Sequence, residues 1–582
     1  MSVVDTNIGM LTHRATPRIP PELVDIILAQ LSPSQYAAGL SKERREVTTA
    51  LSRCARACRT FHFPALKVLW RDQELLHACS VLPTLMEHRV KSDPHAIDFD
   101  DDDDENGNED WFVENGFDGY DHGHQYKCYF YLPGPLSQEA FSRFEYYARL
   151  IHTLRHPRMI HTTWDPSVFM FLQQAALGRQ LFPNVRELVW HYATSDLVTV
   201  VSPQIRILRL ACGPYIDDDD DYANTEEAAF RARRHAIKSL IPGVLHMLPE
   251  LEELTMRLLG HEDFWKLLAP APNHSFIAQN IRRIEISEPR AALMRAALPA
   301  VSTIPQLTEL KITLAGERSD NTFFSPERRT WDKATIHPFA RLHRLRIHAN
   351  PTAMVAILDA IDAPELAEIE LCQRTVEEPI RITQLFHDII RTLCDGHTDT
   401  LRRVQLVFQG VKTARFLSHI QPLFTLHQLR DLDLFVKTDG ALKDMPLADM
   451  VASWPALERL AILTAVLTPD ALARACPGLQ SLTALRLSSV DPSTGKFSLA
   501  TPASQPRESG RKASRRAAPK SVGDDSITGH ALRELRLDKP VRIAQANVSK
   551  LARFLDELFP QLQVERLHVL GEVGKLQDAR RT

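Results

Sequence analysis

The chain has 582 residues, 44% of them hydrophobic and 24% charged, with a formal net charge of −4. This composition supports a sizeable core and excludes a chain that is disordered throughout, while the near-zero charge excludes a global attraction to nucleic acid or to a membrane surface. The eight cysteines form no Cys-x-x-Cys pair, and no stretch approaches 18 uninterrupted apolar residues. Such cysteine usage is typical of a reducing compartment, so we expect an intracellular protein, cytoplasmic and/or nuclear.

The first folded segment is predicted over residues 18–72, after a flexible N-terminus over residues 1–17. Pro20 and Pro21 mark a helix start, where a missing N–H costs least. Four apolar residues follow at helical spacing and are expected on one side of this helix: Leu23, Ile26, Ile27 and Leu31. A second helical run follows, and a third ends at Trp70. Three short helices make a small core, so we expect them to share apolar surface with a partner or with the rest of the chain.

This segment resembles the F-box family at the start of its first helix and at the end of its third. The matching residues are Pro21, Glu22, Leu23, Ile26, Ile27, Leu31, Cys58, Phe61, Leu69 and Trp70. The resemblance implies binding of a Skp-type adaptor and, through it, of a cullin-RING ubiquitin ligase. The adaptor contacts that it implies are Pro20, Pro21, Leu23, Ile26, Ile27, Leu31, Phe61, Leu69 and Trp70. The alternative is that the three helices only cap the domain that follows.

Three segments are predicted between this unit and residue 181. Residues 73–92 read as a helical extension, and residues 127–180 read as a helical connector. Between them, residues 93–126 hold thirteen acidic residues. Like charges at that density repel one another, which predicts an acidic disordered loop. The alternative is that this loop attracts and binds a basic partner.

A short phrase recurs over residues 181–570: an apolar residue, two variable residues, an apolar residue, one variable residue and a third apolar residue. Its thirteen occurrences are Val185/Leu188/Trp190, Ile205/Leu208/Leu210, Leu251/Leu254/Met256, Ile281/Ile284/Ile286, Leu307/Leu310/Ile312, Leu342/Leu345/Ile347, Leu366/Ile369/Leu371, Leu401/Val404/Leu406, Leu429/Leu432/Leu434, Leu457/Leu460/Ile462, Leu482/Leu485/Leu487, Leu532/Leu535/Leu537 and Val564/Leu567/Val569. The last two positions would point to nearly opposite sides of a helix but share one face of a strand. Each phrase therefore predicts a short strand.

Helical runs separate the phrases. One is predicted from Thr383, as its N-cap, to Cys394, and another follows the cap Thr468 with Pro469 at the first helical position. Strand, turn and helix in repetition resemble degenerate leucine-rich repeats, of the kind that follow an F-box in fungal-type F-box proteins. The resemblance implies an α/β fold in which the three-helix F-box-like unit precedes an irregular leucine-rich-repeat solenoid, or horseshoe. A non-solenoid α/β domain with coincidental Leu-x-Leu strands is the alternative.

A basic insertion interrupts the phrases at residues 502–529. It is rich in Ser, Pro, Gly and Ala, which predicts disorder, and it carries a basic cluster from Arg511 to Lys520. The cluster could act in nuclear import or touch nucleic acid, although a solvated loop without such a role is the simpler interpretation. Residues 571–582 are predicted to be a flexible C-terminus.

The sequence holds no phosphate-binding loop, no nucleophile elbow and no zinc-binding spacing, so we expect neither an enzyme nor a cofactor. Side chains between the apolar strand positions should face outward and bind a protein target, because their mixed charge does not suit a polyanion. The candidates are Arg209, Lys311, Arg346, His348, Glu370, Asp433, Phe435, Arg486 and Arg536. The function expected is the substrate-recognition subunit of a Skp-cullin-F-box ubiquitin ligase. A ligase-independent leucine-rich-repeat scaffold is the alternative.

Overall fold

In the computed structural model the chain forms two compact units, which we call the N-terminal unit (Met1–Glu252) and the C-terminal unit (Glu253–Thr582). The structure describes residues 20–33, 41–91, 126–156, 162–190, 196–211, 240–257, 279–288, 291–314, 335–374, 379–412, 416–438, 440–443, 445–476, 479, 481–491, 532–537 and 545–562. Several predicted segments lie outside these residues: 1–17, 93–126 apart from its last residue, 502–529, the phrase at Val564, Leu567 and Val569, and 571–582.

The N-terminal unit begins with three helices, α1 (Pro21–Ala29), α2 (Ser41–Ala57) and α3 (Arg59–Trp70). Their shared core is formed by buried residues of all three helices and by one residue that follows a later helix: Val24, Leu28, Leu51, Ala55, Ala65, Leu66 and Leu150. The three helices therefore do not close a core by themselves. They complete it against the chain that follows.

The rest of the N-terminal unit alternates strands and helices. These are β1 (Asp72–Glu74), α4 (Leu75–Cys79), β2 (Met86–Lys91), β3 (Tyr126–Tyr131), α5 (Gln138–Ala148), β4 (Thr153–Arg155), β5 (Thr162–Trp164), α6 (Pro166–Ala176), β6 (Glu187–Trp190), α7 (Leu197–Val200) and β7 (Ile207–Ala211). Strands β1, β4, β6 and β7 pair in that order as a parallel sheet, and β2, β3 and β5 form a separate three-stranded sheet.

Two predicted helical segments contain strands as well. The predicted extension over residues 73–92 holds α4 but ends in β2, and the predicted connector over residues 127–180 holds α5 and α6 together with β4 and β5 and most of β3. Strand β4 lies between β1 and β6 in the parallel sheet. The strand-and-helix repetition thus begins before residue 181, because Ile151, Leu154 and His156 take the three positions of the phrase, and all three are buried.

The C-terminal unit continues the alternation. Its elements are β8 (Glu253–Arg257), β9 (Arg283–Glu288), α10 (Ala291–Ser302), β10 (Glu309–Leu314), β11 (Arg344–Ala349), α11 (Pro351–Ala360), β12 (Glu368–Gln373), α12 (Pro379–His397), β13 (Arg403–Val411), α13 (Phe416–Ile420), the 3-10 helix η7 (Gln421–Thr425), β14 (Asp431–Thr438), β15 (Leu442–Lys443), α14 (Leu447–Ala452), β16 (Arg459–Leu467), α15 (Pro469–Ala475), β17 (Ala484–Val490), β18 (Glu534–Leu537) and α16 (Gln545–Leu558).

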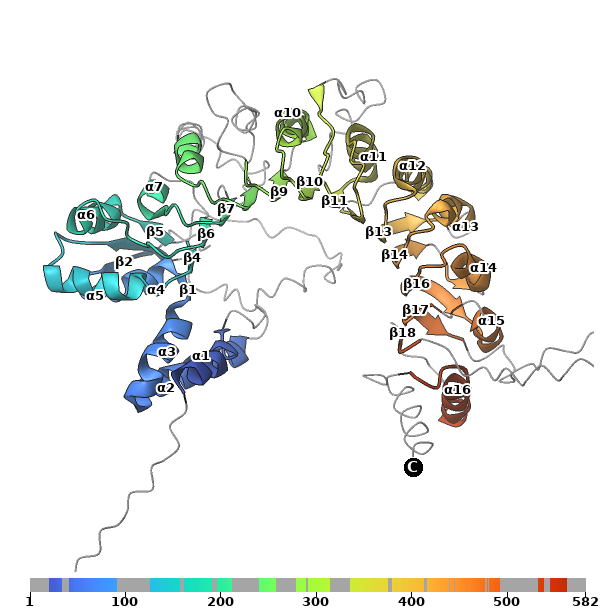
Figure 1. Cartoon of the computed structure of the whole chain (residues 1–582), viewed down its shortest axis with the longest axis horizontal. Helices are drawn as coiled ribbons and strands as arrows, with labels where there is room; N and C mark the ends of the chain where they lie inside the picture. The colour runs from blue at the N-terminus through green and yellow to red at the C-terminus, as the bar shows by residue number, and fades with distance from the viewer. Residues whose placement is uncertain are drawn as a thin grey trace, which may run out of the picture. The chain divides into compact units, whose positions relative to one another are not determined.

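The strands of this unit stack in chain order as one parallel sheet, with only the short β15 beside the path. The helices α10–α16 lie on one side of these strands (Figure 1). Twelve of the thirteen phrases fall on β6–β14 and β16–β18, and every apolar residue of these twelve is at most 5% exposed. The α/β solenoid of irregular leucine-rich-repeat type predicted from the phrases is therefore confirmed.

The two capping predictions have different outcomes. The Thr468 side chain accepts a hydrogen bond from the backbone N–H of Ala471 at 3.3 Å, and Pro469 opens α15, as predicted. The prediction for Thr383 was wrong, because α12 begins four residues earlier at Pro379. The Thr383 hydroxyl instead accepts a hydrogen bond from the backbone N–H of Lys412 and so ties α12 to the end of β13.

Candidate functional site

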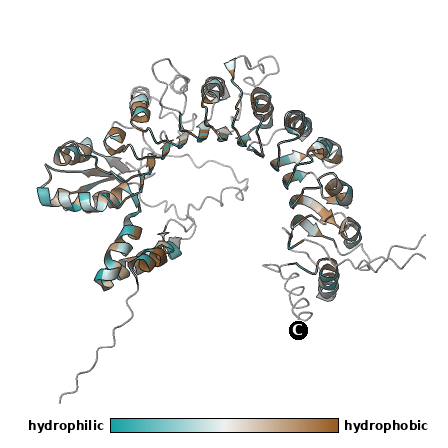
Figure 2. Ribbon diagram, in the orientation of Figure 1, coloured by the Kyte–Doolittle hydropathy of each residue, from teal (hydrophilic) through white to brown (hydrophobic). Residues whose placement is uncertain are grey.

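Helix α1 has apolar residues on two faces. Val24 and Leu28 are buried in the three-helix core, whereas Leu23, Ile26 and Ile27 are 49%, 59% and 56% exposed. Pro20 is also exposed, and the first helical position is Pro21. Figure 2 shows α1 as a mainly hydrophobic helix beside the mainly hydrophilic α2. We call the surface formed by Leu23, Ile26 and Ile27 the apolar face of α1.

The other predicted adaptor contacts have a different placement. Leu31, Phe61, Leu69 and Trp70 are partly buried and pack against the three-helix core. The Trp70 ring lies 4.4 Å from the Tyr147 ring of α5, measured between centroids. These four side chains support the unit from within. The exposed large apolar residues of the three helices are the apolar face of α1 and Phe63 of α3, which is 52% exposed.

The open face of the C-terminal sheet carries a ladder of opposite charges. The first outward residues of eight successive strands, β8–β14 and β16, lie directly opposite one another in the sheet and alternate between acid and base. They are Glu253, Arg283, Glu309, Arg344, Glu368, Arg403, Asp431 and Arg459. Opposite charges on neighbouring strands stabilise the pairing, and like charges would destabilise it. We call this row the charge ladder.

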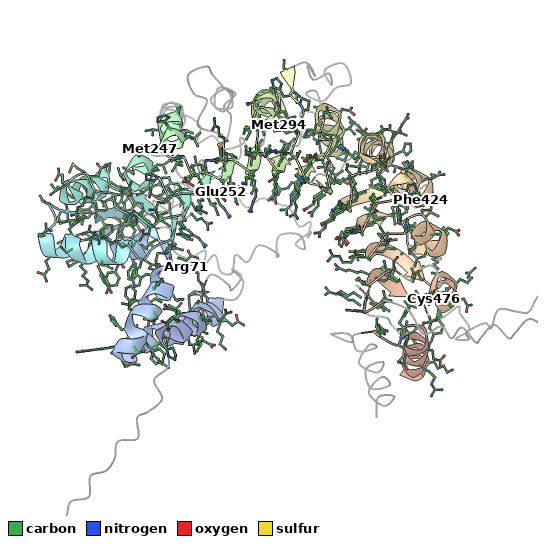
Figure 3. All side chains as sticks on the ribbon, in the orientation of Figure 1. Arg71, Met247, Glu252, Met294, Phe424 and Cys476 are labelled. Carbon is green, nitrogen blue, oxygen red and sulfur yellow. The ribbon has the colours of Figure 1, made fainter. Side chains whose placement is uncertain are left out.

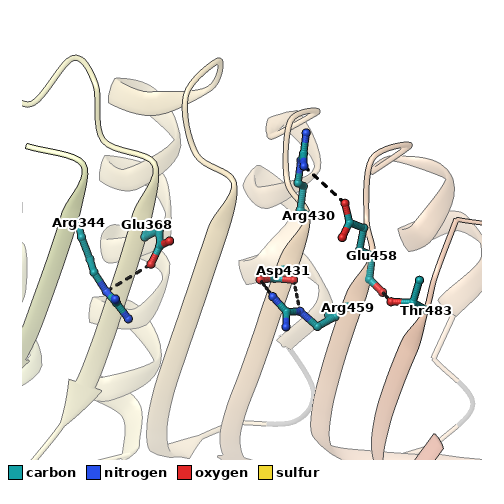
Figure 4. Close-up of polar contacts among 7 residues, drawn as sticks. All are labelled: Arg344, Glu368, Arg430, Asp431, Glu458, Arg459 and Thr483. Atoms are coloured by element: carbon teal, nitrogen blue, oxygen red, sulfur yellow. Dashed lines mark hydrogen bonds and ion pairs between the residues drawn. The ribbon is translucent and has the colours of Figure 1, made fainter. Parts of the chain in front are cut away.

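Several members of the charge ladder form ion pairs. Arg283 lies 3.4 Å from Glu253, and Arg344 lies 3.3 Å from Glu368. The Arg459 guanidinium donates two hydrogen bonds to the carboxylate of Asp431, one of them at 2.6 Å. Figure 4 shows the last two pairs together with the ion pair between Arg430 and Glu458. The ladder thus neutralises itself and offers no stripe of one sign.

Most predicted target-facing residues lie in the next outward row and are also paired. Lys311 contacts Glu285 at 2.9 Å, and Glu370 contacts both Arg346 at 3.3 Å and His348 at 3.2 Å. The hydrogen bond from His348 is the main cause that holds the pKa of Glu370 below its usual range.

Two further target-facing arginines, Arg209 and Arg536, form ion pairs within their own unit. In the N-terminal unit Arg209 lies 3.7 Å from Glu187, and Arg536 forms an ion pair with Glu534 of its own strand. Both pairs are partly exposed, so each contributes little to stability.

Asp433 on β14, unlike these residues, has no ion pair with a described residue. Its carboxylate makes no hydrogen bond or ion pair with any residue that the structure describes. Burial raises its pKa, with a further contribution from Asp431, against the lowering effect of Arg403, Arg459 and Arg486. A half-buried carboxylate with a raised pKa and no direct hydrogen bond or ion pair is a candidate for a binding contact.

An aromatic residue lies beside Asp433 on the same strand. The Phe435 ring is partly exposed, and the Arg486 guanidinium lies 5.4 Å from its centroid. Val407 on β13 is the registered neighbour of Phe435 and is also partly exposed. Asp433, Phe435, Arg486 and Val407 therefore form a mixed apolar and charged cluster, which we call the β14 cluster.

The sequence predicted most of these residues to face outward, but it did not predict which of them lie next to one another on neighbouring strands. It identified Asp433, Phe435 and Arg486 as separate outward positions and missed Val407 and the charge ladder. Register between strands was the missing information, because alternation along one strand does not say which side chain of the next strand lies opposite.

The metal-ligating and thiol side chains of the described residues form no site. No group of three or more His, Cys, Asp or Glu residues that could hold a metal ion is found in the described ranges. Burial raises the pKa of Cys79 and Cys394 to about 12 and that of Cys476 to about 11, so these thiols stay protonated at neutral pH and are poor nucleophiles. Among the helices that the structure describes, none is both long and apolar enough to cross a membrane.

No protein-family model matches the chain, and no similar curated protein is found. Among solved structures, an internalin from Listeria monocytogenes overlaps 61% of this chain and 84% of its own, at 10% identity and a TM-score of 0.29. A complex of TLR13 with ssRNA13 overlaps 74% of this chain and 56% of its own, at 13% identity and a TM-score of 0.34. A complex of Rad7 and Elc1 in yeast overlaps 49% of this chain and 74% of its own, at 12% identity and a TM-score of 0.18.

Proposed function

We propose that the chain is the substrate-recognition subunit of a Skp-cullin-F-box ubiquitin ligase. In this proposal the apolar face of α1 binds the Skp-type adaptor, and the open face of the C-terminal sheet binds a protein target. The observation that carries the proposal is the double face of α1. Val24 and Leu28 fix the helix to its unit while Leu23, Ile26 and Ile27 meet solvent.

The apolar face of α1 has the properties of a docking surface. Its three large side chains are each about half exposed or more, and they follow one another within a turn and a half of a helix. Complete burial of such a side chain contributes about 1.5–3 kcal/mol relative to full exposure, so a partner could gain part of this from each residue. Because the helix is already fixed by its other face, little ordering would be needed on binding.

The open sheet face suits a protein target. Its charge ladder is compensated, so it lacks the basic stripe that a phosphate backbone would require. The β14 cluster offers an aromatic ring, an arginine and a carboxylate without a direct hydrogen bond or ion pair. Aromatic and arginine side chains dominate binding energy at protein interfaces, which favours this cluster as the target contact.

The proposed mechanism is proximity. A target held on the sheet would be close to the ubiquitin-charged enzyme of the ligase, which raises the effective concentration of its lysines. No side chain of this chain takes part in bond making.

Co-purification with a Skp-type adaptor tests the proposal. The full chain should capture the adaptor, and Ile26→Asp with Ile27→Asp should abolish capture because two charges would be buried against an apolar partner. Leu417→Asp on α13 is the matched control, since Leu417 is an exposed apolar residue, 39% exposed, on a helix remote from α1 in sequence. Equal capture by both variants would reject the adaptor role.

A ligase-independent scaffold is the second candidate. It is favoured by the packing of Trp70 on Tyr147 and by the place of Leu150 in the three-helix core, which are the contacts expected of an end cap. Removal of the three helices would destabilise the unit under either function, because it would expose the same contacts. The apolar face of α1 separates them: a scaffold keeps its partners when Ile26 and Ile27 become Asp.

A further inference from the structure

The beginnings of the strands in the N-terminal unit carry a row of basic residues. Arg71 precedes β1, His152 precedes β4, Arg186 precedes β6 and Arg206 precedes β7. Backbone hydrogen bonds join each to the next: the carbonyl of Arg71 accepts from the N–H of His152, that of His152 from Arg186, and that of Arg186 from Arg206, all at 2.8 Å. These residues are therefore stacked at the spacing of paired strands, about 4.8 Å.

This row lines a pocket of about 630 Å³ between the strand beginnings and the helices α1 and α3. Its walls come from α1 (Asp25, Ile26 and Ala29), from α3 (Lys67 and Val68), from the basic row, and from Thr153, Glu187, Ile207 and Glu252. Figure 3 labels Arg71, which follows the end of α3, and Glu252, which follows Arg206 in the row of backbone bonds. Pockets of roughly 300–1,000 Å³ are the usual size for small ligands.

The cations of the pocket outnumber the anions that could neutralise them. Glu252 lies 3.5 Å from Arg206, and Glu187 lies 3.7 Å from Arg209. Lys67, Arg71 and Arg186 have no ion-pair partner among the residues that the structure describes, and Asp25 is the acid that remains to oppose them.

The electrostatics of His152 agree with this geometry. Burial lowers its pKa, and Arg186, Arg71 and Lys67 lower it further, in that order. Three cations therefore act on one imidazole at the centre of the row. Their mutual repulsion would be relieved by a bound anion.

We propose that this pocket binds a small multivalent anion of the polyphosphate class, held by Lys67, Arg71 and Arg186. The cations lie on a helix and at two strand beginnings, so a ligand with several anionic groups could meet them together. Charged hydrogen bonds of Arg to phosphate are among the stronger protein contacts. The inference does not rest on adaptor binding: Ile26 belongs both to the apolar face of α1 and to the pocket wall, but Leu23 and Ile27 do not line the pocket.

Titration of the full chain with tripolyphosphate, by calorimetry at fixed ionic strength, tests the proposal. We expect saturable binding with one site, and a loss of affinity of about tenfold or more in Arg186→Gln, as one charged contact is removed. Arg402→Gln is the matched control: Arg402 is exposed and has the same place before β13 that Arg186 has before β6. Its affinity should be unchanged.

Tripolyphosphate binding is also measured in two further variants, Lys67→Gln and Leu23→Asp. If Arg186→Gln does not fold, Lys67→Gln replaces it, since Lys67 is exposed on α3 and has no role in the core. Leu23→Asp should retain tripolyphosphate binding even where adaptor binding is lost, so that the two proposals can fail separately. Equal losses in Arg186→Gln and Arg402→Gln, or no binding beyond that of sulfate at the same ionic strength, would overturn the inference.

Discussion

The apolar residues of the described strand phrases are all buried, whereas several apolar residues of α1 are exposed. The phrases on β6–β14 and β16–β18 bury every apolar side chain, and their open face is charged and largely self-compensated. Helix α1 buries Val24 and Leu28 but leaves three apolar neighbours exposed. The open sheet face must therefore bind a partner through single residues that lack an ion pair, such as Asp433. The apolar face of α1 can bind through apolar area alone.

The largest effect is expected from the two faces of α1 themselves. Leu28→Ala should reduce the free energy of unfolding by about 2–5 kcal/mol, because it opens a cavity in the three-helix core. Ile27→Ala truncates a side chain of similar size that is exposed to solvent, so it should change the free energy of unfolding by less than about 0.5 kcal/mol. Urea unfolding followed by circular dichroism measures both. Similar losses in the two variants would show that α1 has no exposed face.

The second largest effect is expected in the buried core of the C-terminal unit. The Trp454 indole N–H donates to the backbone carbonyl of Leu423 at 2.8 Å, and the side chain is completely buried. Trp454→Phe should reduce stability by about 1–3 kcal/mol, because the core loses this hydrogen bond and part of the indole volume. The Leu423 carbonyl keeps its second bond, from the backbone N–H of Leu426 at 3.0 Å. A shift in the urea midpoint of the C-terminal unit would show it, and an unchanged midpoint would contradict this burial.

The charge ladder should matter less than either core. Asp431→Asn weakens the double hydrogen bond from Arg459, whose side chain is 59% exposed, so we expect a loss of about 1 kcal/mol. A double-mutant cycle with Arg459→Gln isolates the pair. The coupling should shrink at high salt, and a coupling that is insensitive to salt would argue against an electrostatic ladder.

The smallest effect should be a gain. The raised pKa of Asp433 means that its ionised form is disfavoured in the folded state, so its unfavourable contribution grows as pH rises from the ordinary pKa of 3.8 through the folded value. Asp433→Asn should therefore raise the melting temperature at neutral pH but not well below pH 3.8, where both the folded and the unfolded state hold the proton. Thermal melts across this range measure it. A lower melting temperature at pH 7 would mean that the fold, rather than a partner, uses this carboxylate.

The sequence predicted the strands well, because three apolar positions with one fixed spacing recur wherever a strand is covered on one face. It missed β4, whose third position is His156, packed against Trp190 with ring centroids 4.6 Å apart. It missed β1, where Gln73 stands in place of an apolar residue at the end of a helical run.

The faces of α1 were also beyond the sequence. Leu23, Val24, Ile26, Ile27 and Leu28 are all apolar, so periodicity could not say which side meets the core. The structure buries Val24 and Leu28, two residues that the F-box resemblance did not single out. The charge ladder required register between residues that lie 24–35 positions apart in the sequence, which no local pattern contains.

The affinity of the full chain for a Skp-type adaptor, measured by calorimetry, tests the role of α1 most directly. Leu23→Asp and Leu417→Asp place the same change on two exposed leucines, and Asp is well tolerated in the first turn of a helix, where Leu23 lies. We predict that both variants keep the melting temperature and that only Leu23→Asp loses adaptor binding, by at least about tenfold. Adaptor binding that is equal in both variants, or absent from the unaltered chain, would contradict the account.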